Sequence, residues 1–116
     1  MKVGIVGGRD FIDARMFYYE ILQFLTFYGE ITQVISGGAC GADTLAEKWS
    51  KDNNVPFIVF KPDWKKFGKA AGFMRNSDIV KESEFVIAFW DGKSKGTKDT
   101  INKTKELKIP LKIVRY

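Results

Sequence analysis

Four short segments of the sequence combine glycines with polar or charged side chains, a composition that suits anion binding. Glycines let a backbone turn sharply and bring its N–H groups close to a ligand, and arginine supplies a planar fork of donors that matches phosphate or carboxylate. Taken singly, each segment could be an ordinary turn, but together they indicate recognition of a phosphorylated ligand. The segments are GGRDF (7–11), SGGACGAD (36–43), AAGFMRNSD (70–78) and WDGKSKGT (90–97).

The segment SGGACGAD also contains the only cysteine, Cys40, and so raises the question of a reactive thiol. The chain has no histidine, which excludes Cys–His and Ser-His-Asp nucleophiles and every zinc site that needs histidine. We therefore expect Cys40 to be a buried or half-buried spacer and expect no metal site. The glycines at 37, 38 and 41 are expected to face a phosphate, with Asp43 capping a helix or reaching a ribose hydroxyl.

Apolar runs alternate with these segments and predict the elements that position them. Strands are expected over 2–6, 31–36, 56–60, 84–89 and 110–114, and helices over about 14–28, 42–51, 70–82 and 97–107, with a basic loop over 61–69. Two neighbouring parallel strands must be joined by a crossover connection, and a helix between them supplies it. The fold class expected is α/β: one Rossmann-like domain over residues 1–116, with a five-stranded, mostly parallel sheet and helices on both faces. In this architecture ligands bind at the carboxyl ends of the strands, where the four segments fall.

Composition sets further expectations. The net charge of +5 makes an anionic partner plausible. One cysteine permits no internal disulfide, and no apolar run approaches the roughly 20 residues of a membrane span, so a cytoplasmic protein without membrane contact is expected. The first helix, over 14–28, carries more aromatic side chains than one face can bury, which makes a homodimer reasonable.

In their order along the chain, the four segments resemble the SLOG superfamily in its YspA and YpsA-related branch, over nearly the whole sequence. Members of that superfamily bind nucleotides or nucleotide-derived ligands on a Rossmann-like sheet with a glycine-rich phosphate site. The resemblance implies a small phosphorylated nucleoside as partner, and a bound nucleotide as the one cofactor to consider. Together with Gly8 and Asp10 of the first segment, the residues it assigns to the ligand site are Arg9, Ser36, Gly37, Gly38, Gly41, Asp43, Arg75, Asn76, Asp91, Gly92, Ser94, Gly96 and Thr97.

The resemblance carries less far for catalysis. LOG-type phosphoribohydrolases of the same superfamily use a PGGxGTxxE motif, whose glutamate acts at the ribose. The corresponding stretch here, DGKSKGTKDT, has Thr100 where the glutamate falls, and Asp99 one residue earlier would point about 100° away on a helix. A binding or sensing module is therefore the leading hypothesis. The alternative is a nucleotide N-glycosidase or phosphoribohydrolase that takes its carboxylate from Asp91, Asp99, Glu47 or Asp43.

A third hypothesis is single-stranded nucleic-acid binding, in the manner of DprA from the same superfamily. In KPDWKKFGK (61–69), Trp64 and Phe67 alternate with lysines, a pattern that can stack bases and neutralise phosphates. A solvated lysine loop beside a small anionic ligand explains the same residues, so nucleic acid is the least favoured partner. Trp64 and Trp90 are also candidate stacking surfaces for a nucleotide base.

Overall fold

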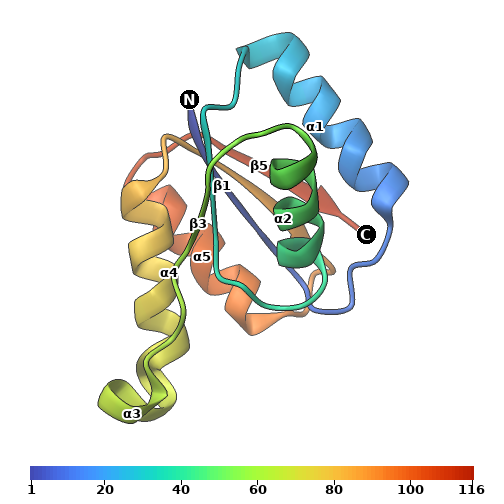
Figure 1. The fold of residues 1–116 in the computed structure, drawn as a ribbon. Coiled ribbons are helices and arrows are strands. Elements are labelled where there is room, and N and C mark those ends of the chain that lie inside the picture. Colours follow the sequence, from blue (N-terminus) through green and yellow to red (C-terminus); the bar gives the residue numbers. More distant parts are fainter.

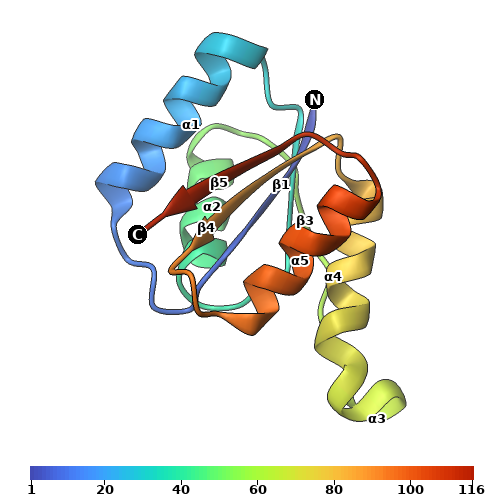
Figure 2. The same cartoon turned by 180° about the vertical axis from the view of Figure 1, so that it is seen from behind.

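A five-stranded sheet, all of it parallel, forms the centre of the protein in a computed structural model that describes residues 1–116 (Figures 1 and 2). The spatial order of the strands is β3-β2-β1-β4-β5. The strands are β1 (Lys2–Gly7), β2 (Gln33–Ser36), β3 (Phe57–Val59), β4 (Phe85–Trp90) and β5 (Leu111–Arg115). The helices are α1 (Ala14–Tyr28), α2 (Ala42–Asp52), α3 (Trp64–Phe67), α4 (Ala71–Glu82) and α5 (Lys95–Glu106), with a 3-10 turn, η1 (Gly68–Ala70), before α4. The predicted Rossmann-like α/β fold is confirmed.

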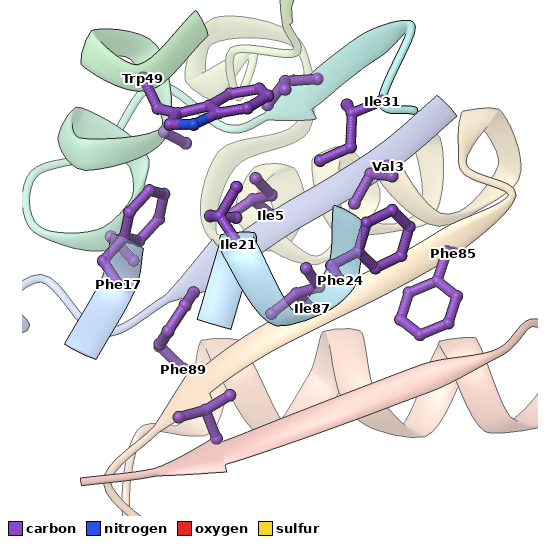
Figure 3. Close-up of a cluster of buried hydrophobic side chains, with 14 of the residues drawn as sticks. Val3, Ile5, Phe17, Ile21, Phe24, Ile31, Trp49, Phe85, Ile87 and Phe89 are labelled. Atoms are coloured by element: carbon purple, nitrogen blue, oxygen red, sulfur yellow. The ribbon is translucent and has the colours of Figure 1, made fainter. Parts of the chain in front are cut away.

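Hydrophobic side chains cover both faces of the sheet, because neighbouring residues of a strand point to opposite sides. On one face, Ile5 packs with residues of α1 and α2 such as Phe17 and Trp49 in the larger cluster (Figure 3). On the other face, Val6 packs with Ile79 of α4 and with residues of β2, β4 and α5 in a smaller cluster. The sheet is therefore a middle layer between two pairs of helices, as Figures 1 and 2 show from opposite sides.

Local signals in the sequence set most helix ends. The side chain of Asp13 accepts a hydrogen bond from the N–H of Met16 at 3.0 Å, so that α1 begins at Ala14, and Gly29 follows its last residue. The expected loop over 61–69 is wrong in part, because this stretch contains the short helix α3. Oδ1 of Asp63 caps that helix by accepting a hydrogen bond from the N–H of Lys66 at 3.1 Å. This helix projects from the body of the molecule at the start of α4 (Figure 1). Strand β3 is half-buried, since it lies at the sheet edge.

The order of the strands reverses between β1 and β4. Chain connections from β1 run outward through β2 to β3, and those from β4 run the opposite way to β5. The loops that follow β1 and β4 therefore separate to opposite faces and leave a crevice at the carboxyl end of the sheet. This crevice positions the candidate site.

Candidate functional site

A cavity of about 400 Å³ opens at the carboxyl ends of β1, β2 and β4. Only three of its 15 lining residues are hydrophobic, Val6, Ala39 and Ile79, and its volume lies within the range of small-molecule sites. All four glycine-bearing segments contribute to it. The lining residues are Val6, Gly7, Gly8, Arg9, Asp10, Gly37, Ala39, Asp43, Arg75, Asn76, Ile79, Ser94, Gly96, Thr97 and Thr100.

The loops after β1 and β2 touch through Gly41. Its φ of +75° is a conformation that other residues rarely adopt, and a Cβ there would collide with the backbone oxygen of Gly8 and lie 2.7 Å from that of Arg9. Helix α2 begins at the next residue without any side-chain cap. The N–H of Ala42, the first residue of α2, donates to the carbonyl oxygen of Gly8 at 3.4 Å. The positive end of the α2 dipole still attracts an anion at this edge of the sheet.

Arg75 spans the cavity from α4 to the loop after β2. Its Nη1 donates a hydrogen bond to the carbonyl oxygen of Gly37 at 2.9 Å, and its Nε donates to Oδ1 of Asn76 at 3.0 Å. Burial lowers the pKa of Arg75, the charge of Asp43 raises it and the charge of Arg9 lowers it. The two arginines are therefore close enough to attract one anion together. Arg75 lies in the second turn of α4, because α4 begins at Ala71.

Asp43 is a buried carboxyl group at the start of α2. Its Oδ2 accepts a hydrogen bond from the N–H of Ala39 at 2.9 Å, while its Oδ1 is buried without a partner. Burial raises the pKa of Asp43 above 3.8, although the Ala39 N–H, the nearby Ser36 hydroxyl and the charge of Arg75 act in the opposite direction. The Ser36 hydroxyl makes no hydrogen bond of its own and does not line the cavity.

Asp43→Asn is expected to stabilise the protein at neutral pH. Because burial disfavours the charged carboxylate, the native state holds the Asp43 proton more tightly than the unfolded chain does. The stability that this group contributes is therefore complete below pH 3.8 and falls as pH rises through the raised pKa. Urea unfolding from pH 4 to pH 8 should show the variant ahead at pH 7 and the gap narrowing toward acid. A wild-type protein that is more stable at pH 7 would mean that attraction to Arg75 outweighs the cost of burial.

The start of α5 forms the opposite side of the cavity. The Oγ of Ser94 caps α5 by accepting from the N–H of Thr97 at 3.4 Å, and both residues line the cavity. The N-terminus of α5 thus faces the same space as that of α2. Thr100, at the position of the LOG glutamate, also lines the cavity, and its hydroxyl donates to the carbonyl oxygen of Gly96 at 3.3 Å.

Three of the four proposed catalytic acids do not line the cavity. Asp91 forms a turn, in which its Oδ1 accepts from the N–H groups of Lys93 and Ser94 at 2.8 Å, and these bonds hold the pKa of Asp91 below its usual value. Asp99 turns away from the position of Thr100. Its Oδ2 accepts from Nδ2 of Asn76 at 3.2 Å and pairs with Nζ of Lys103 at 2.7 Å. Glu47 also lies outside the lining.

Several other residues named from the sequence lie outside the cavity. Gly38, Gly41 and Gly92 shape its loops without lining it. Cys40 is exposed, so the expectation of a buried spacer is wrong. Trp90 donates from Nε1 to the carbonyl oxygen of Ser94 at 3.1 Å and has Arg115 over its ring, while Trp64 is on α3. Neither tryptophan lines the cavity as a stacking surface.

Sequence reasoning missed Tyr116 as a partner of the first loop. Its hydroxyl donates a hydrogen bond to Oδ1 of Asp10 at 2.6 Å, and its ring lies 4.8 Å from that of Phe11. Burial of the hydroxyl raises the pKa of Tyr116, and the hydrogen bond to the negatively charged Asp10 raises it further. A Cβ on Gly8 would collide with the same hydroxyl, so Tyr116 fixes the loop that carries Arg9. No local pattern identifies this tyrosine, because its partner lies 106 positions earlier.

No group of three or more histidine, cysteine, aspartate or glutamate side chains is arranged to hold a metal ion. None of the helices combines the length and the apolar character that crossing a membrane requires.

Comparison with known proteins identifies the family. The sequence model of the YspA, cpYpsA-related SLOG family matches residues 1–67. The gene 61 protein of Mycobacterium phage D29 is 33% identical over 118 residues, an alignment that covers 95% of this chain and 93% of the phage protein. No solved structure gave a significant match. The matched residues include the loops after β1 and β2, and the rest of the cavity lies within the alignment with the phage protein. On this evidence, the chain belongs to the YspA, cpYpsA-related SLOG family.

Proposed function

We propose that the protein binds a nucleotide or a nucleotide-derived ligand, with phosphate in the cavity at the carboxyl end of the sheet. The observation that carries this proposal is the convergence of two arginines and two helix N-termini on one space of about 400 Å³. Each helix end places a partial positive charge there, and Arg9 and Arg75 add full charges. Membership of the SLOG family suggests the same class of ligand.

The other lining residues suit the sugar of such a ligand. Asp10 and Asp43 place carboxylate oxygens at the same cavity, and a carboxylate accepts hydrogen bonds from ribose hydroxyl groups. Oδ1 of Asp10 already accepts from Tyr116, which leaves its second oxygen for the ligand. Asn76 is held at its amide nitrogen by Gly96 and Asp99, so its contribution is to position Arg75.

Gly96 offers a test that does not disturb the fold. It lies in the first turn of α5, it lines the cavity, and a Cβ there would meet no atom within 4 Å. Gly96→Asp should retain the fold, because an acidic residue is favourable at a helix N-terminus, yet it places a negative charge in the phosphate site. We expect it to weaken nucleotide binding on the order of 100-fold, since like charges in contact cost several kcal/mol.

The matched control is Gly96→Ala, which adds a side chain without charge. It should stabilise α5 by about 0.5–1 kcal/mol and keep affinity within a few fold. Isothermal titration calorimetry with AMP, ADP and ADP-ribose measures all three proteins. No binding of any nucleotide by the wild-type protein, or equal affinity of the aspartate variant, would overturn the proposal.

A hydrolytic enzyme is the second candidate, and the burial of Asp43 is the observation that favours it. A carboxyl group with a raised pKa in a ligand cavity is a common arrangement for acid–base catalysis. Chromatography of AMP and ADP-ribose after incubation with the protein should reveal released base if the site cleaves the glycosidic bond. Turnover that Asp43→Asn removes, while nucleotide still binds, would establish the enzyme. Unchanged nucleotides would leave binding as the function.

A further inference from the structure

Helix α1 is apolar on the face that points away from the sheet. Its inner face buries Phe17, Ile21 and Phe24 in the core. Its outer side exposes Tyr19 by 60%, Leu22 by 59% and Phe27 by 74%. Only Arg15 and Glu20 are charged among its 15 residues. A surface helix in contact with water alone normally carries charged and polar residues on its outer face, so α1 has the composition of a helix that is covered on both sides.

A groove of about 280 Å³ lies between α1 and the strands β4 and β5. It shares no lining residue with the ligand cavity. Aromatic side chains dominate the lining. At its borders lie two charges of opposite sign, Glu20 on α1 and Lys112 on the edge strand β5. The groove is lined by Tyr19, Glu20, Gln23, Phe24, Phe27, Tyr28, Phe85, Ile87 and Lys112.

Four charged residues around this surface have no partner within the chain. Arg15 and Lys112 are basic, Glu20 and Glu30 are acidic, and none of them belongs to any of the four ion pairs of the structure. Arg15 lies at the N-terminal end of α1, and Glu30 follows its C-terminal end. The surface is therefore balanced in charge and reverses sign from one end of the helix to the other.

We propose that α1 packs against α1 of a second copy of this chain, antiparallel, about a two-fold axis near Leu22. A two-fold interface brings the same surface of each copy together, so each residue meets its counterpart in reverse order. Arg15 of either copy then comes to Glu30 of the other, and Leu22 lies against the centre of the opposite helix. Antiparallel helices also align their dipoles favourably.

The spacing of the exposed residues fits this arrangement. Residues 15, 19, 22 and 26 recur at intervals of four, three and four, the repeat by which helices pack along one another. The aromatic groove beside this line offers a site for aromatic side chains of the second copy, and aromatic residues are enriched at interfaces between proteins. Because Arg15 and Glu30 face each other at both ends of the helix pair under the two-fold operation, a second copy of this chain complements the surface. The proposal is independent of the ligand site.

Sedimentation equilibrium over a range of concentrations tests the proposal. The wild-type chain should be a dimer, and Leu22→Glu should be a monomer, since it buries two carboxylates at the axis. Leu22 is exposed in the single chain, so circular dichroism of the variant should match that of the wild type. Leu107→Glu is the matched control. Leu107 is 51% exposed at the end of α5, away from α1, and the Leu107→Glu protein should remain a dimer. A monomeric wild type, or a dimer that Leu22→Glu leaves intact, would overturn the proposal.

A charge exchange tests the antiparallel register. Arg15→Glu and Glu30→Arg should each weaken dimerisation by about 10-fold, because each places like charges together. The double variant should return the dissociation constant to within a few fold of the wild type. Single variants without effect, or a double variant no better than either single one, would contradict this register.

Discussion

Arg75→Met is expected to weaken nucleotide binding by the protein about 100-fold or more. Arg75 is the cavity's half-buried cation, fixed at one end by Gly37 and along its length by Asn76. A charge-assisted hydrogen bond to phosphate contributes about 1.5–3 kcal/mol, and a bidentate contact makes two, so the loss should reach about 100-fold or more. Methionine keeps the apolar stem and so limits the structural change. Calorimetric titration with ADP-ribose or AMP measures the difference.

Two further variants make the result specific. Arg75→Lys retains a positive charge but not the planar fork, so it should lose part of the affinity and rank between wild type and Arg75→Met. Arg115→Met removes a cation that lies over Trp90, outside the cavity, and should bind normally. If Arg75→Met binds as tightly as the wild type, phosphate does not occupy the space between α4 and the loop after β2.

Gly41→Ala is expected to have the largest effect on stability, with a loss of about 3 kcal/mol or more in the free energy of unfolding. The backbone conformation of Gly41, with φ +75° and ψ −122°, strains any residue that has a Cβ and accounts for about 1–3 kcal/mol of this. The remainder comes from the new Cβ, which meets the backbone of Gly8 and Arg9 and must push apart the loops after β1 and β2. Urea unfolding followed by circular dichroism measures the loss, and nucleotide affinity should fall with it because both loops line the cavity.

Gly29→Ala separates the two contributions. Gly29 also has a positive φ, +95°, but a Cβ there would meet no atom within 4 Å. Its substitution should therefore cost only the backbone strain. The difference between the two variants then measures the contact of the loops. Equal losses for Gly41→Ala and Gly29→Ala would show that this contact contributes nothing to stability.

Much of the fold was predictable because its signals are local. Buried strands such as β1 and β4 are short apolar runs that end at glycine or at a polar turn, and the caps at Asp13 and Gly29 place both ends of α1. Regular alternation of such strands with helices then leaves few topologies. Helix α3 was missed because four residues are too few to show periodicity, and only the cap at Asp63 marks its start.

The candidate site was less predictable, since position in a loop does not fix the direction of a side chain. Asp91 follows β4 as expected, yet its carboxylate is used by the N–H groups of its own turn. The rotation of α5 does follow from helical spacing: it brings Thr100 to the cavity and turns Asp99 toward Asn76 and Lys103. The part played by Tyr116 depends on tertiary contact alone.

The hydrogen bond from Tyr116 to Asp10 joins residues that are 106 positions apart, and it has a consequence for folding. Tyr116 directly follows the edge strand β5, so we expect the loop that carries Arg9 to reach its final shape only after β5 has joined the sheet. A partly folded chain that lacks this strand would have the glycine-rich loops but no fixed first loop. If the cavity binds a nucleotide as proposed, binding is coupled to completion of the whole sheet. A bound nucleotide should then slow the opening of β5 in hydrogen exchange, although β5 contributes no residue to the cavity.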